Sequence, residues 1–439
     1  MVDAAGAIAA LEAALERTPS TSEPYEHALL AHRLGVAYAE SPGRPGERLR
    51  QALAHLDRAA SLLEPTFHPV EHARVLTAAG AVRRSMGAPD AALELFRRAL
   101  VLAAHRVEPD EAAAMANNVG LALLETGQAA GAVAHFDDAR ARFSPHSAEG
   151  RRGRSAALHN RGLALAAPGP QQDLAAAVDA FDEALAAASL DDAPLHHGLI
   201  HHSRGVAAMA LAGGAPPGCG GHWRTAAIES FRRALELFTW PAHRSQHAVA
   251  SFNLGRAWAA GDAVDDLRLA LVCFEDAVTA FDPRDQGEAW RAAYAALEAT
   301  DARLAGSHPG WTRADHLVAL LGDAVADAPA LVEGRLARWL PLPGLARSTA
   351  LDAFSQAAFR RGGDGGTAAV VGLLVAAMER PTEAQEAVLD SLLSVRRAAD
   401  EGARPGIDAV IDRMIGEAVV GPQRVFVRDY LTAGGFERP

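Results

Sequence analysis

The chain has 439 residues, of which 49% are hydrophobic and 22% are charged, and its formal net charge is −12. This length exceeds a single ordinary core and predicts two or three domains or a repeat array. All 42 basic residues are arginine, and acidic residues outnumber them. Because nucleic-acid binding depends on a surplus of positive charge, we expect no nucleic-acid partner.

Neither the cysteines nor the N-terminus indicates secretion. Cys219 and Cys273 do not form a CxxC pair, so the sequence predicts neither a disulfide framework nor a cysteine-rich zinc module. The N-terminus carries acidic residues where a secretory signal needs a basic start. The longest apolar run, residues 367–378, is shorter than the roughly 20 residues that span a bilayer. We therefore expect a soluble, cytoplasmic protein with no membrane partner.

A motif of small, large and small side chains recurs from the N-terminal side onward. Alanine is followed after four residues by phenylalanine or leucine, and after seven by alanine, and successive large residues are 40 to 50 positions apart. Such residues share one face of a helix, so each copy predicts an amphipathic helix. The six copies are Ala52/Leu56/Ala59, Ala92/Phe96/Ala99, Ala132/Phe136/Ala139, Ala177/Phe181/Ala184, Ala227/Phe231/Ala234 and Ala270/Phe274/Ala277.

A glycine precedes each copy within a stretch of helical composition. Turn signals such as Gly87-Ala88-Pro89 separate this stretch from the motif helix, so each unit predicts a helix hairpin. A missing side chain in the first helix lets the second approach closely. The N-terminal Ala7/Leu11/Ala14 has the same spacing and predicts a capping half-repeat in residues 1–24. The glycines are Gly35, Gly80, Gly120, Gly162, Gly205 and Gly255.

These spacings resemble the tetratricopeptide repeat (TPR). Gly80/Ala92/Phe96/Ala99 and Gly120/Ala132/Phe136/Ala139 carry the resemblance, and the period near 42 is similar to the longer repeats of kinesin light chains and many bacterial regulators. The resemblance implies an all-α fold in which about six TPR-like hairpins form a right-handed superhelix over residues 25–284. Stacking of the hairpins would supply the core that one hairpin lacks.

Helical composition continues after the motif ends. Residues 285–439 predict a helical C-terminal region, either a continuation of the solenoid or a separate domain. The VFV segment at 425–427 has the composition of a strand, and residues 362–366 that of a loop. The predicted helices cover residues 286–304, 313–327, 345–361, 366–379, 382–400 and 406–419, separated by proline and glycine.

The resemblance also implies a binding groove that is lined by the first helices. The residues two and three positions before each glycine would face this groove. Asparagine can both donate to and accept from a peptide backbone, so we expect the groove to hold a peptide or protein partner. The alternative is that these side chains bridge neighbouring helices. The candidate residues are His32, Arg33, Thr77, Asn117, Asn118, His159, Asn160, His202, Ser203 and Asn253, together with Arg256 one residue after its glycine.

Histidines cluster in the segment LHHGLIHHSR. His197 and His201 have a spacing that can bind a divalent metal, but no glutamate accompanies them as a base. We interpret the cluster as groove-lining imidazoles, with a metal site as the alternative. A pH-sensitive contact also stays open, because free imidazole titrates near pH 6.5. No phosphate-binding loop or GxSxG motif is present in the sequence.

The sequence therefore favours a non-enzymatic binding protein, an adaptor or regulator without a cofactor. Two alternatives stay open: an enzyme or enzyme subunit that uses the groove as its active site, and a structural scaffold for a multiprotein complex. The sequence makes no prediction about the oligomeric state.

Overall fold

The computed structural model describes residues 4–41, 45–170, 172–216, 218–240, 242–322, 334–336, 338–340, 342, 344–378, 380–418 and 422–436. Within these residues the regular secondary structure is α-helical throughout, which confirms the predicted all-α repeat fold. No helix in this part of the chain is long and apolar enough to cross a membrane. The chain divides into two compact units, Met1–Thr239 and Trp240–Pro439.

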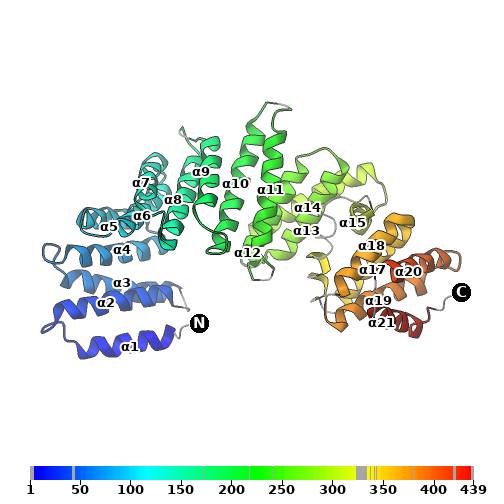
Figure 1. Ribbon diagram of the computed structural model, residues 1–439, viewed down its shortest axis with the longest axis horizontal. Coiled ribbons are helices and arrows are strands. Elements are labelled where there is room, and N and C mark those ends of the chain that lie inside the picture. Colours follow the sequence, from blue (N-terminus) through cyan, green and yellow to red (C-terminus); the bar gives the residue numbers. More distant parts are fainter. Residues whose placement is uncertain are drawn as a thin grey trace. The chain divides into compact units, whose positions relative to one another are not determined.

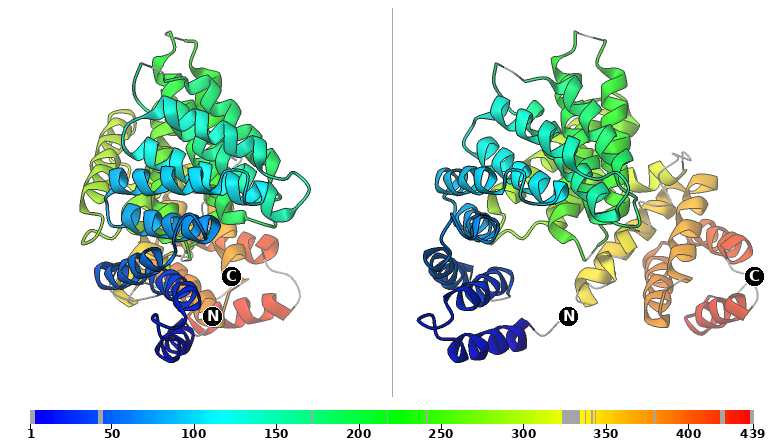
Figure 2. Two further views of the ribbon diagram at one scale, coloured as in Figure 1. Left: turned by 90° about the vertical axis from the view of Figure 1, so that its left-hand side faces the viewer. Right: turned by 60° about the vertical axis from the view of Figure 1, so that its left-hand side comes forward.

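The first unit is a stack of helix hairpins (Figure 1). Helix α1 packs against α2, and five hairpins follow, α2–α3, α4–α5, α6–α7, α8–α9 and α10–α11. In the first four hairpins the second helix also packs on the first helix of the next hairpin, and Figure 2 shows the hairpins side by side. The helices are α1 (Ala4–Arg17), α2 (Pro24–Glu40), α3 (Pro45–Leu62), α4 (Pro69–Ser85), α5 (Pro89–Ala103), α6 (Pro109–Glu125), α7 (Ala129–Arg142), α8 (Ala148–Ala166), α9 (Leu174–Ala187), α10 (Pro194–Gly214) and α11 (Gly221–Leu237).

In each hairpin the glycine of the first helix packs against the bulky motif residue of the second helix. A Cβ atom on Gly80 would lie 2.5 Å from Cε1 of Phe96, and one on Gly120 would lie 2.6 Å from Cε1 of Phe136. Real side chains do not approach this closely, so the two helices meet at a point where only glycine fits. Burial of each phenylalanine contributes about 1.5–3 kcal/mol to stability. The same contact joins Gly35 to Leu56, Gly162 to Phe181 and Gly205 to Phe231.

Contacts between hairpins define the inner side of this stack. Neighbouring first helices touch, α2 with α4, α4 with α6, α6 with α8 and α8 with α10. Neighbouring second helices make no comparable contact in the described residues. A stack with its first helices closer together curves toward them. We call the surface formed by α2, α4, α6, α8 and α10 the inner face.

The second unit begins with a sixth hairpin, in which Gly255 on α12 packs against Phe274 on α13. Helix α14, which corresponds to the predicted helix 286–304, packs on α13. The remaining helices form a further layered group (Figure 1). The helices are α12 (Arg244–Ala259), α13 (Val264–Ala280), α14 (Gly287–Ser307), α15 (Arg313–Gly322), α17 (Gly344–Arg361), α18 (Gly363–Met378), α19 (Thr382–Ala398), α20 (Arg404–Ala418) and α21 (Pro422–Ala433).

Helix α13 differs from the other second helices because it is buried on nearly every side. Besides the motif residues, it buries Leu269, Leu271 and Val272. Leu269 and Val272 belong to the apolar core that also contains residues of α15, α17, α18, α19, α20 and α21. The C-terminal helices cover the surface of α13 that faces water in the second helix of an ordinary repeat. This surface is therefore apolar as well, and α13 is apolar on all sides.

Two local predictions about the C-terminal region are wrong. The VFV segment lies inside α21, where Val427 and Leu431 are four residues apart and share the buried face. Residues 363–366, predicted as loop, form the first turn of α18, because Gly366 packs directly against the backbone carbonyl of Ala358. The predicted helix 313–327 is observed to Gly322, and residues 323–327 lie outside the described residues.

Candidate binding face of the first helices

Two hydrogen bonds join predicted groove residues on neighbouring first helices. Asn160 Nδ2 on α8 donates to Asn117 Oδ1 on α6 at 3.0 Å. His159 Nε2, also on α8, is 3.0 Å from Ser203 Oγ on α10. These bonds bring four predicted residues together along three helices of the inner face. They also realise, for these four residues, the bridging role that the sequence left as the alternative.

The asparagine pair keeps hydrogen-bonding groups available. Its single bond uses one amide proton of Asn160 and the carbonyl of Asn117, so the Asn117 amide and the Asn160 carbonyl have no further partner within the described residues. Asn118 is half-buried, and its side chain makes no hydrogen bond to that part of the chain either. The inner face therefore presents both donors and acceptors, which is what pairing with a polypeptide backbone requires.

The other predicted residues of the first unit share this partial exposure. His32, Thr77 and His202 are half-buried, and Arg33 is exposed. The Thr77 hydroxyl donates to the carbonyl of Ala73 in its own helix at 2.9 Å, so it is committed to α4. Asn253 and Arg256 lie on α12 in the second unit, where the Arg256 guanidinium is 6.0 Å from the centre of the Phe252 ring.

Arginines near the inner face are neutralised by carboxylates. Arg161 on α8 pairs with Asp137 at 2.9 Å, and Arg204 on α10 pairs with Asp182 at 2.7 Å. Each acid lies on the second helix of the preceding hairpin. The charges of Arg161 and Arg204, next to the glycines of α8 and α10, are therefore satisfied within the repeats.

The histidines of the inner face are neutral at physiological pH. Burial, followed by charge repulsion from His196 and His202, lowers the pKa of His159 to about 3. Burial also lowers the pKa of His202, and burial followed by the charge of Arg74 lowers the pKa of His32. In each case burial is the largest cause, because the packed repeats reduce the contact of the imidazole with water and so disfavour its charged form.

Repetition of one contact decides the type of fold. In successive hairpins a glycine of the first helix meets the bulky residue of the second, and the first helices line the inner side. The chain is a TPR-like repeat protein.

Comparison with known proteins gives matches among solved structures alone. No protein-family model matches the sequence, and no curated protein matches it. Among solved structures, the apo form of RapI is 15% identical, covering 64% of this chain and 92% of that chain, with a TM-score of 0.46. A TPR protein from Parabacteroides merdae is 15% identical, covering 68% and 93%, with a TM-score of 0.40. A C-terminal TPR fragment from Cytophaga hutchinsonii is 14% identical, covering 67% and 95%, also with a TM-score of 0.40.

A second set of histidines supports the TPR-like hairpins from within. His27, His72 and His197 lie eight residues before their glycines. Each ring nitrogen meets the carbonyl oxygen nine residues earlier, at 2.7, 2.7 and 3.2 Å respectively. These carbonyls lie at the end of the preceding helix, where no helical N–H is available. His197 of the proposed metal pair thus has a structural partner, and among the described residues no group of three or more potential metal ligands occurs.

Sequence reasoning missed the apolar part of the inner face. Leu163 and Val206 directly follow the glycines of α8 and α10, and they are 37% and 45% exposed. Leu163 is one helical turn from Asn160, and Val206 is one turn from His202 and Ser203, so they share the face of the TPR-like array that carries the polar residues. The signal was present in the sequence, since these leucine and valine residues occupy the same repeat position as Arg256.

Proposed function

We propose that the protein is a non-enzymatic adaptor whose TPR-like array binds an extended polypeptide segment along the inner face of the first unit. The observation that carries this proposal is the hydrogen bond between Asn160 and Asn117, which lines up amide groups from two first helices. Asn118 adds a third amide on the same helix as Asn117. An extended backbone offers alternating donors and acceptors that such amides can pair with.

The apolar residues beside the amides support a polypeptide rather than a highly charged ligand. Leu163 and Val206 offer contact area for side chains of a bound segment, and Leu199 on α10 is 39% exposed one turn from Ser203. Arg161 and Arg204 are already paired with carboxylates, so recognition here depends on hydrogen bonds and apolar contact. We expect the bound segment to carry uncharged, apolar side chains.

Peptides selected from a random displayed library against the immobilised full chain test the proposal. We expect the double variant Asn118→Ala/Asn160→Ala to bind a selected peptide at least tenfold more weakly, by titration calorimetry. Val206→Asp should have a similar effect. Val101→Asp is the matched control, because Val101 is 72% exposed on the second helix α5. Equal affinity of the double variant and the unaltered chain would show that the inner face is not the binding site.

A further inference from the structure

A groove of about 430 Å³ lies in the second unit, where α17, α19 and α20 meet (Figure 1). Its volume falls within the roughly 300–1,000 Å³ of small-molecule sites, which are typically apolar with a few polar groups. Val395, Ile407 and Val410 form an apolar floor and are only 7%, 7% and 6% exposed. The other described residues of the wall are Gln356, Phe359, Arg360, Gly362, Gly363, Ala398, Ala399, Ala403 and Gly406.

Small residues at the rim keep this groove open. Ser355 on α17 and Ser391 on α19 join the two helices, with their hydroxyl oxygens 2.8 Å apart. Both helices end within two turns of this contact, at Arg361 and Ala398. The rim beyond it consists mainly of glycine and alanine, and a Cβ atom on Gly406 would have no neighbour within 4 Å. The space is therefore not filled by side chains of the described residues.

The wall of the groove offers no uncompensated charge to a ligand. Arg360 is the single charged side chain among the described residues of the wall. Its Nε and Nη2 donate to Asp315 on α15 at 3.2 and 2.9 Å, so the pair has no net charge. A Cβ atom on Gly362 would lie 3.8 Å from the carbonyl oxygen of Phe359, which accepts no hydrogen bond from the described residues. An anion would therefore face a carbonyl and a carboxylate, and a cation would face a guanidinium.

We propose that this groove binds a small, uncharged and mainly apolar molecule. The ligand lies against Phe359, Val395 and Ile407, and removal of its apolar surface from water favours binding by roughly fourfold in affinity for each buried methylene group. A charged head group finds no partner here that compensates for its lost hydration. The site lies in the second unit and does not depend on the function proposed above.

Fluorescence titration of the full chain with 1-aminoanthracene tests the proposal, since this uncharged apolar probe emits more strongly in an apolar environment. Displacement of the probe by 1-octanol, octanoate and octylamine then compares three head groups on one apolar body. We expect 1-octanol to displace the probe at a concentration at least tenfold below that of either ion. Equal displacement by the three compounds, or no rise in emission on addition of the probe, would overturn the proposal.

Two substitutions at the rim locate the site. Gly406→Phe on α20 and Ala398→Phe on α19 each add a ring at the opening, and both residues are exposed, so the core stays unchanged. We expect each variant to bind the probe at least tenfold more weakly. Gly416→Phe is the matched control, because Gly416 is exposed on α20, has open space around an added Cβ and does not line the groove. Probe affinity in a folded rim variant equal to that of Gly416→Phe would refute the site.

Discussion

Asn160 on α8 donates a hydrogen bond to Asn117 on α6, at 3.0 Å, across two consecutive first helices. The two residues occupy neighbouring phases of their repeats, two and three positions before the glycine. The bond orients both amides along the inner face while leaving one donor group and one acceptor group on the pair. The same two side chains thus stabilise the packing of the repeats and, in the binding mode that we propose, also contact the partner.

Loss of this bond should affect binding more than stability. In Asn160→Ala the Asn117 carbonyl loses a partly exposed partner, so we expect the free energy of unfolding to fall by about 0.5–1.5 kcal/mol. Chemical denaturation measures this change. A loss well above that range would mean that the asparagines serve mainly to hold α6 and α8 together.

The glycine of each hairpin should be intolerant of even one methyl group. In Gly120→Ala the new Cβ would lie 2.6 Å from Phe136, so the helices must separate, and we expect a cost of about 1–3 kcal/mol. Gly372 on α18 is the control, because a Cβ atom added there would have no neighbour within 4 Å, and Gly372→Ala should be neutral or stabilising by up to about 1 kcal/mol. Thermal melting of both variants checks the opposite signs. The double variant Gly120→Ala/Phe136→Leu should recover part of the loss.

Acid should destabilise the fold through His159. Its pKa in the folded state is about 3, below the ordinary value of 6.5, so the unfolded chain binds the proton more tightly between these values. The contribution to stability is complete above pH 6.5 and is lost as the pH falls from 6.5 toward 3, by about 1.4 kcal/mol per pH unit. Denaturation measured between pH 7 and pH 4 should show a shallower decline in His159→Gln. His146→Gln is the control, since His146 is exposed; identical slopes in the two variants would contradict the assignment.

The histidines at the helix ends should be structural. His72 is buried, and its Nδ1 is 2.7 Å from the carbonyl oxygen of Leu63. In His72→Phe that carbonyl loses its partner inside the protein, so we expect a loss of about 1–3 kcal/mol in the free energy of unfolding. The same exchange at the exposed His222 serves as a comparison. If His72→Phe is as stable as His222→Phe, the ring contributes by packing alone.

Buried charge should make Arg335 essential to the second unit. Its replacement in Arg335→Met leaves Glu275 without its buried partner and removes a partner of Asp276, so we expect destabilisation of about 3–5 kcal/mol. Arg233→Met is the comparison, because the ion pairs of Arg233 with Glu229 and Glu236 lie at the surface and contribute little. Urea denaturation of both variants tests this difference.

The sequence by itself determined the hairpins and their repetition. The formation of a helix and its pairing into a hairpin depend on residues that are close together in the sequence. The spacing of Ala132, Phe136 and Ala139 indicates the helical face, and their distance from Gly120 indicates the contact between the two helices. The same periodicity placed the asparagines at one phase of the repeat. It also indicated that Asn118 and Asn160 belong to first helices, because their distance from the glycine is constant.

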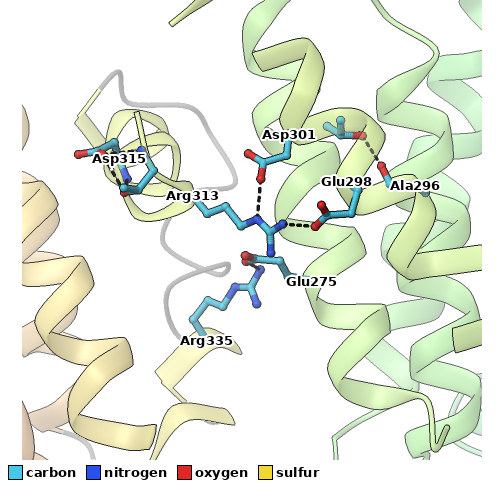
Figure 3. A network of polar contacts seen from close by, with 9 residues as sticks. Glu275, Ala296, Glu298, Asp301, Arg313, Asp315 and Arg335 are labelled. Atoms are coloured by element: carbon cyan, nitrogen blue, oxygen red, sulfur yellow. Dashed lines mark hydrogen bonds and ion pairs between the residues drawn. The ribbon is translucent and has the colours of Figure 1, made fainter. Parts of the chain in front are cut away.

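Only the tertiary structure decided which of these side chains meet. The bond from Asn160 to Asn117 and the neutralisation of Arg161 by Asp137 depend on how the hairpins stack. The lowered pKa of His159 depends on its burial between packed helices, which the composition of the chain does not predict. The ion pair between Glu275 and Arg335 (Figure 3) is the extreme case. Glu275 lies in the sixth hairpin and Arg335 lies 60 residues later, beyond the last repeat, so no local spacing could relate them.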